Sequence, residues 1–149
     1  MLINEDLILM KMPAENKGDA IRMLAEKAAA LGRVNDVNVF CQSVLHREAD
    51  YSTGMGFGVA IPHGKSESVN EPLLMFATVD SLDWQSLDGK PVDLVFLIGV
   101  PADDASAVHL KILANLSRRL IKDDFRSQLR AAVTSSDVMN VLTEAGIGL

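Results

Sequence analysis

Two stretches in the first third of the chain carry apolar residues at helical spacing. Residues 19–31 repeat an apolar position every three or four residues, and Gly32 follows where a helix commonly ends. Residues 37–48 place their apolar side chains on one face, with Asn35 or Asp36 before them as a capping residue. Both stretches are therefore predicted to be amphipathic helices.

Continuous apolar runs without helical period lie in the middle of the chain. Residues 73–79 and 92–100 have the pattern of strands that are buried on both faces. A shorter run, residues 7–12, predicts a strand or an extended entry segment. The glycine-rich run 52–58 predicts a loop, and residues 59–61 a short strand that ends sharply at Pro62.

The last third of the chain has helical periodicity. Three helices are predicted, at about residues 106–121, 125–133 and 138–144, with Asp123 or Asp124 and Ser135 or Ser136 as caps. Strands therefore alternate with helices, and no Ser/Gly/Pro-rich linker or repeat interrupts them. The pattern predicts one α/β sandwich domain over residues 1–149.

Composition and charge narrow the class of function. A net charge of −6 over 149 residues argues against nucleic acid, which is usually bound by a clustered basic surface. The apolar runs are shorter than the roughly 18 residues that span a bilayer. The N-terminus is acidic where a signal peptide would be basic, and Cys41, the only cysteine, is expected in the core. We therefore expect a cytoplasmic protein that does not insert into membranes.

The three histidines lie in different settings. His46 falls opposite the apolar stripe of its helix, which is typical of a solvated histidine, and it is given no role. His109 lies on the helix predicted for residues 106–121, with Ile112, Leu113 and Leu116 on the same face. It is either a hydrogen-bonded core residue or a second imidazole near a catalytic one.

His63 is the strongest candidate for chemistry. It is expected at the end of an apolar strand, where Pro62 restricts the backbone and Gly64 lets the chain turn away beside the ring. A neutral imidazole is one of the few side chains that is nucleophilic near pH 7. A turn histidine with a purely structural hydrogen bond fits the same residues, so the residues alone leave both interpretations open.

Arg47 and Glu48 come shortly before the glycine-rich run. Arg47 could simply interact with the helix dipole and solvent, and Glu48 could pair with a nearby cation. A phosphoryl site, however, needs delocalised positive charge, and Arg47 is the nearest arginine before His63.

Motifs for other chemistries fail on inspection. Gly64-Lys65-Ser66 imitates a phosphate-binding loop, and Gly54-Met55-Gly56 imitates a dinucleotide loop, but both patterns require glycine where Val59 stands. Metal-ligand spacings and the G-x-S-x-G motif are missing from the sequence. No nucleotide, metal or other cofactor is predicted.

Two segments resemble one family. The run from Glu48 to Lys65, EADYSTGMGFGVAIPHGK, is similar to the active-site signature of the enzyme IIA family of the sugar phosphotransferase system, fructose/mannitol class. The run from Val108 to Arg118, VHLKILANLSR, resembles the helix that carries the second histidine of that family. The resemblance covers essentially the whole chain.

The resemblance implies a fold, a reaction and partners. The fold would be a mixed β-sheet flanked by helices on both sides. His63 would be phosphorylated, with His109 assisting and Arg47 stabilising the phosphoryl group. The donor would be the phosphorylated histidine phosphocarrier protein, and the acceptor would be a cysteine of a separate B component. The B component would work with a membrane C component, and fructose is the sugar we expect the system to take up and phosphorylate.

Two other functions remain open at this point. The nitrogen-related regulatory relative has the same fold and phosphohistidine but acts by binding regulatory targets. A binding module with a structural His63 belongs to a different class. Labelling by phosphoenolpyruvate and the two general phosphotransferase proteins would exclude that module.

Overall fold

A mixed sheet forms the centre of the molecule. The computed structural model describes residues 2–104 and 107–147, except the side chains of residues 108 and 109. Its strands are β1 (Ile8–Leu9), β2 (Gly54–Gly56), β3 (Val59–Ala60), β4 (His63–Ser66), β5 (Leu73–Leu82) and β6 (Val92–Pro101). They form one sheet in the order β1-β5-β6-β3-β2, with β4 also paired to β6. β5 runs antiparallel to β6, whereas β3 and β4 run parallel to it, which confirms the mixed sheet.

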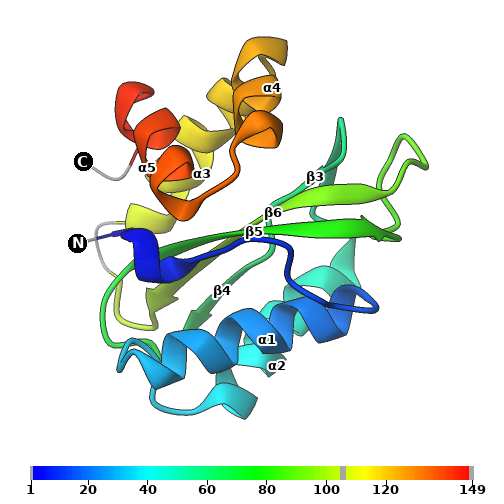
Figure 1. Ribbon diagram of the computed structural model, residues 1–149. Helices are drawn as coiled ribbons and strands as arrows, with labels where there is room; N and C mark the ends of the chain where they lie inside the picture. The colour runs from blue at the N-terminus through cyan, green and yellow to red at the C-terminus, as the bar shows by residue number, and fades with distance from the viewer. Residues whose placement is uncertain (1, 105–106, 148–149) are drawn as a thin grey trace.

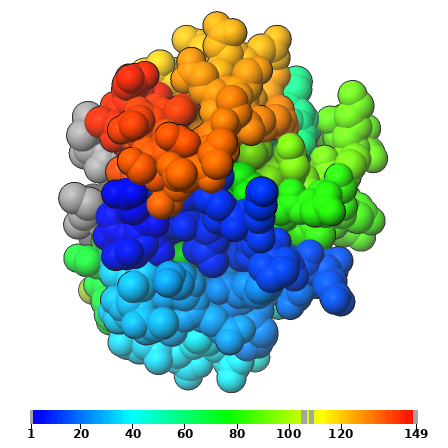
Figure 2. All heavy atoms as spheres, in the orientation of Figure 1, coloured from blue at the N-terminus to red at the C-terminus, as the bar shows by residue number. Residues whose placement is uncertain are grey.

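Helices cover both faces of this sheet, as predicted (Figure 1). α1 (Lys17–Ala30) and α2 (Val37–Asp50) pack on one face, while α3 (Val108–Leu120), α4 (Asp123–Ala131) and α5 (Ser135–Glu144) cover the other. A short 3-10 helix, η1 (Glu5–Leu7), precedes β1 and contacts α5. Figure 2 shows this N-terminal segment, in blue, between the two helical layers.

The core lies on both sides of β5 and β6. The predicted strands 73–79 and 92–100 are confirmed, and nearly all of their residues are buried. Phe76 and Phe96 pack against each other across the pair, with ring centroids 4.8 Å apart. Cys41 is buried as expected. Burial raises the pKa of its thiol, so Cys41 behaves as a core residue.

The ends of the first two helices follow ordinary capping chemistry. Gly32 adopts φ +76° and closes α1, with its N–H donating to Ala29 and that of Arg33 to Ala28, at 3.0 and 2.9 Å. Asp36 caps α2 by accepting from the N–H of Val39 at 3.1 Å, as one of the two predicted residues.

The predicted caps of the last two helices are wrong. Lys122 precedes α4 without a side-chain cap, and Asp123 lies inside that helix, where it pairs with Arg126. α5 is capped by Thr134, which accepts from the N–H of Asp137 at 3.1 Å while the Asp137 carboxylate accepts from the N–H of Thr134 at 3.0 Å. This reciprocal pair outcompetes Ser135 and Ser136, which cannot form both bonds.

The glycine-rich run is more ordered than predicted. It contains β2, which forms an antiparallel hairpin with β3 through a turn at Phe57 and Gly58. At the N-terminus, by contrast, the strand predicted over residues 7–12 shrinks to β1.

His63 does not end a strand, which corrects the prediction. β3 and β4 pair with β6 in one register, with Val59 opposite Leu94 and His63 opposite Ile98. The two are a single strand interrupted at Pro62, because proline has no N–H for the ladder. The carbonyl of Pro62 still accepts from the N–H of Ile98 at 3.0 Å, so the register continues.

Candidate functional site

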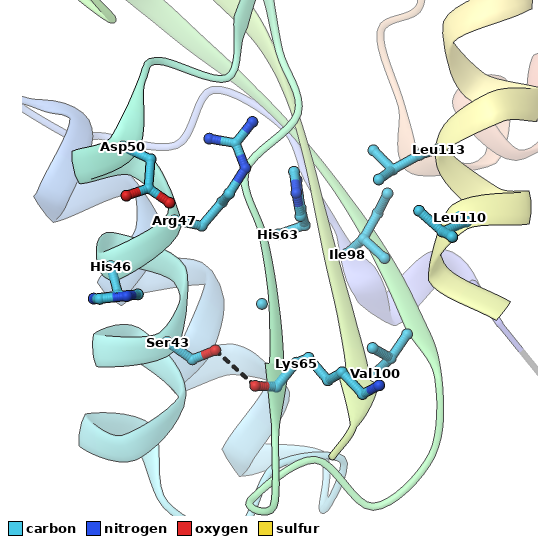
Figure 3. Close-up of a pocket in the computed structure, with 11 residues that line it drawn as sticks. Ser43, His46, Arg47, Asp50, His63, Lys65, Ile98, Val100, Leu110 and Leu113 are labelled. Carbon is cyan, nitrogen blue, oxygen red and sulfur yellow. Dashed lines mark hydrogen bonds between the residues drawn. The ribbon is translucent and has the colours of Figure 1, made fainter. Parts of the chain in front are cut away.

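A cavity of about 320 Å³ lies at the open edge of β4. In the described part of the chain β4 pairs with β6 alone, which leaves its other edge open. α2 and α3 approach this edge from opposite faces of the sheet. Figure 3 shows how the lining residues lie. They are Ser43, His46, Arg47, Asp50, His63, Gly64, Lys65, Ile98, Val100, Leu110 and Leu113.

His63 is half-buried at the start of β4 and lines this cavity. Its Nδ1 lies 2.8 Å from the carbonyl oxygen of Ile61. A carbonyl oxygen can only accept, so Nδ1 is the protonated donor of the neutral ring. In that form the lone pair of the ring lies on Nε2, which is the ring nitrogen able to act as a nucleophile.

Gly64 serves close packing rather than a turn. It lies inside β4, and a Cβ atom there would come within 2.8 Å of Val44 Cγ2 and 2.9 Å of Ser43 Oγ. α2 can therefore approach β4 only where the strand has no side chain. Ser43 fastens the same contact by donating its hydroxyl to the carbonyl of Lys65 at 2.8 Å (Figure 3).

Arg47 lines the same cavity as His63, from the last turn of α2. Its Nη1 donates to the carbonyl of Tyr51 at 2.7 Å, and its guanidinium carbon lies 4.4 Å from the centre of the Tyr51 ring. In Figure 3 Arg47 and His63 extend in the same direction from facing elements. The predicted arginine thus brings a positive charge to the cavity that His63 lines.

Four polar residues at the cavity were given no role at the site from the sequence. His46 is exposed, as predicted, but it lines the cavity together with Ser43, Asp50 and Lys65. Positions 43, 46, 47 and 50 share one face of a helix, and position 65 shares the face of a strand with position 63. The helical and strand periodicities could have identified these four residues once His63 and Arg47 were taken as site residues.

The third predicted residue, His109, has a side chain outside the described part of the structure. Its backbone lies in the first turn of α3. Leu110 and Leu113 of that helix line the cavity, while Ile112 and Leu116 are buried beneath it. The approach of His109 to His63 therefore stays a prediction.

The charge and chemistry of the cavity suit an anion. Arg47 and Lys65 carry two positive charges against the single carboxylate of Asp50. Within the described residues, no three His, Cys, Asp or Glu side chains are grouped so that they could hold a metal ion. Nor does that part of the chain contain a helix long and apolar enough to cross a membrane.

Glu48 lies outside the cavity and is paired with a cation, which is the structural role considered for it. Its Oε2 lies 3.2 Å from Lys17 Nζ on α1, and the residue is 6% exposed.

Comparisons with known proteins show the family of the chain. The model of the family described as "Phosphoenolpyruvate-dependent sugar phosphotransferase system, EIIA 2" matches residues 1–145. The fructose-specific EIIA component of Haloferax volcanii is 39% identical over 140 residues, covering 93% of this chain and 90% of the relative. The nitrogen regulatory protein of Bradyrhizobium diazoefficiens is 40% identical over 142 residues, covering 95% and 92%.

Solved structures give the same fold. The nitrogen regulatory protein IIA-Ntr of Neisseria meningitidis superimposes with a TM-score of 0.85 at 26% identity, covering 95% of this chain and 96% of that one. The complex of enzyme IIA and phosphorylated enzyme IIB for mannitol from Escherichia coli gives 0.80 at 20% identity, over 95% and 97%, and supports the fold alone. Together these matches confirm the resemblance, and the chain belongs to the EIIA 2 family of the phosphoenolpyruvate-dependent sugar phosphotransferase system.

Proposed function

We propose that residues 1–149 act as one domain that carries a phosphoryl group on Nε2 of His63. The observation that carries this proposal is the 2.8 Å hydrogen bond from His63 Nδ1 to the Ile61 carbonyl. It favours the tautomer in which Nε2 can attack, in a cavity that the cations Arg47 and Lys65 also line. The domain works in the cytoplasm and needs no cofactor.

The reaction is a pair of phosphoryl transfers. The lone pair of His63 Nε2 forms a bond to phosphorus while the N–P bond of the donor phosphohistidine breaks, and the donor nitrogen keeps that electron pair. In the second transfer a cysteine thiolate forms a P–S bond, and the electron pair returns to Nε2. The proton stays on Nδ1, hydrogen-bonded to the Ile61 carbonyl, throughout both transfers, so positioning and charge do the catalytic work.

The neighbouring side chains stabilise the group in transit. Arg47 offers a planar fork of N–H donors to the phosphoryl oxygens, and Lys65 adds a second positive charge. His109 donates a hydrogen bond to the phosphoryl group or steers it, without carrying it covalently.

The partners follow from the family. The donor is the phosphorylated histidine phosphocarrier protein, and the acceptor is the cysteine of a B component that serves a membrane C component. A IIA–IIB complex is known for the mannitol system of Escherichia coli. The Haloferax relative, 39% identical, is named for fructose, which makes fructose the sugar to test first.

The experiment is labelling from radioactive phosphoenolpyruvate with the two general phosphotransferase proteins. The parent chain should gain acid-labile label, His63→Gln should gain none, and the matched variant His46→Gln should label like the parent. Labelled protein is then offered to membranes that each contain one sugar transporter, and fructose should drain the label. Label on the His63→Gln protein would disprove the proposed carrier residue.

The second candidate function is that of the nitrogen-related regulators. The 40% identity to the Bradyrhizobium protein and the TM-score of 0.85 to the Neisseria structure favour it. In that case His63 would still be labelled, but no sugar transporter would drain the label. The membrane step therefore separates the two functions.

A further inference from the structure

Glu48 is a buried carboxylate that receives hydrogen bonds from three other segments of the chain. Lys17 Nζ on α1 donates to it at 3.2 Å, and the indole Nε1 of Trp84, between β5 and β6, at 3.3 Å. Thr53, just before β2, donates its backbone N–H at 3.3 Å and also its hydroxyl. The carboxylate thus joins α1, α2, the β2–β3 hairpin and the β5–β6 loop.

A chain of hydrogen bonds runs from this carboxylate to His63. Thr53 donates its N–H and its hydroxyl to Glu48. Its carbonyl accepts from the N–H of Ile61 at 3.1 Å. The carbonyl of Ile61 in turn accepts from His63 Nδ1 at 2.8 Å. Thr53 is therefore one of the contacts that hold the residue whose carbonyl accepts from the histidine ring.

Ile61 is held by the segment before β2 as well as by its neighbours on β6. Ile61 lies in the interruption between β3 and β4, next to Pro62, whose carbonyl accepts from the N–H of Ile98 on β6 at 3.0 Å. The N–H of Ile61 is held by Thr53, which lies outside β2. Glu48 secures Thr53 from the opposite side.

Stability alone is a weak reason for such a group. A buried ion pair gains little over a well-packed apolar pair, because both charges lose their hydration. Fixed geometry is the better reason, since phosphoryl transfer depends on the alignment of attacking and leaving atoms. Glu48 also directly follows Arg47, so the same bonds hold the helical turn that carries this arginine.

We propose that Glu48 is a positioning residue for phosphoryl transfer: through Thr53 it holds the Ile61 carbonyl that keeps His63 in its reactive tautomer. The proposal rests on His63 being the phosphoryl acceptor. It assigns a role at the site to a residue that lies outside the cavity.

Two measurements on three variants test the proposal. Glu48→Gln turns an amide NH₂ toward donors that the carboxylate accepts, and Thr53→Val removes only the hydroxyl. Asp93→Asn is the control, because it weakens another ion pair, to Arg130 at 2.9 Å, away from the cavity. The ring nitrogens of His63, assigned with His63→Gln, are followed by ¹⁵N–¹H NMR in unphosphorylated protein, and the rate of phosphorylation by the phosphorylated phosphocarrier is measured.

In Glu48→Gln the ring should populate both tautomers, and phosphorylation should slow by about ten- to a hundredfold. Thr53→Val should shift both readouts less, in the same direction. Asp93→Asn should lower the urea midpoint and leave both readouts like the parent.

A Glu48→Gln protein with the parent's tautomer and rate would overturn the proposal, whatever its stability. If that variant does not fold, the same result in Thr53→Val would overturn it. If the parent chain is never phosphorylated, the proposed function fails. The tautomer of the unphosphorylated variants still decides whether Glu48 positions the ring, because that readout needs no donor.

Discussion

A backbone carbonyl, rather than another side chain, fixes the ring of His63 at Nδ1. The Ile61 carbonyl does not titrate, so the acceptor that faces Nδ1 is the same at every pH. A carboxylate in its place would raise the basicity of the ring and favour a protonated imidazole, which cannot attack. The acceptor also survives replacement of the Ile61 side chain, because it belongs to the main chain.

Arg47 gives the first prediction at this scale. Arg47→Gln should slow phosphorylation of His63 by about a hundredfold, the usual loss when a donor to a developing negative charge is removed. Arg47→Lys should recover only part of the rate, because an ammonium group lacks the planar fork. The rates are measured by quenching the reaction with the phosphorylated phosphocarrier at a series of times.

The matched control is Arg22→Gln on the exposed side of α1, where Arg22 bonds Asn38. It removes the same charge far from the cavity and should label at the parental rate. Equal slowing in both variants would mean that net charge, rather than Arg47 itself, governs the reaction.

Helices and long strands were predictable at the scale of elements, whereas the segment around the site was only partly so. Periodicity gave α1, α2, β5 and β6, because each buries a regular face against the core. The β2–β3 hairpin was not predicted because a glycine-rich run is typical of a loop. The course of β4 after Pro62 was missed because a proline normally stops a strand, and only pairing with β6 continues the register.

Gly64 gives a prediction for the contact between α2 and β4. Gly64→Ala should destabilise the fold by about 1–3 kcal/mol, because its Cβ would lie 2.8 Å from Val44 Cγ2 and 3.2 Å from the Val44 nitrogen. Urea unfolding measures the loss. Gly18→Ala in α1 meets only Asn16 Oδ1 at 3.5 Å and should be neutral or gain less than about 1 kcal/mol. Similar losses in both would rule out the packing explanation.

The cap of α5 predicts a dependence on pH. The backbone N–H groups of Val133 and Thr134 hold the pKa of Asp137 below its usual value. A lowered folded pKa stabilises the fold above the unfolded pKa of about 3.9, and this stability is lost as the pH falls through the folded value. Asp137→Asn should therefore have a lower urea midpoint than the parent at pH 7, and the gap should narrow below about pH 4.

Glu144→Gln, at the other end of α5, changes the same charge without touching the cap. It should show no such narrowing. A gap for Asp137→Asn that stays constant down to pH 2 would exclude the carboxylate as its cause.

The site arises at the scale of the whole molecule, where two helical layers meet around the open edge of β4. The sequence predicted His63 and Arg47, and both line one cavity. It could not predict that Leu110 and Leu113 complete the wall, because that depends on how α3 crosses the sheet. Local patterns name candidate residues, but only packing brings residues 47, 63 and 110 together.

Leu110 gives a prediction for docking. Leu110 is 57% exposed and lines the cavity, where the proposed phosphoryl donor would dock. Leu110→Ser should change stability by less than about 0.5 kcal/mol and raise the KM for the phosphorylated phosphocarrier about tenfold. Steady-state phosphorylation measures this KM.

Leu87→Ser is the control, because Leu87 is 96% exposed and does not line the cavity. It should leave the KM unchanged. A rise as large as that of Leu110→Ser would show that the effect is not specific to the rim.

The shared register of β3 and β4 sets how this chain tolerates insertions and deletions. Side chains alternate between the two faces of a sheet, so one residue added or removed between Ala60 and His63 would reverse the face of everything that follows. The β2–β3 turn is fixed as well, because the Gly58 carbonyl accepts from the N–H groups of Asp93 and Leu94 at 3.0 and 3.1 Å. Library designs and domain fusions should therefore keep the spacing from Gly58 to His63 fixed.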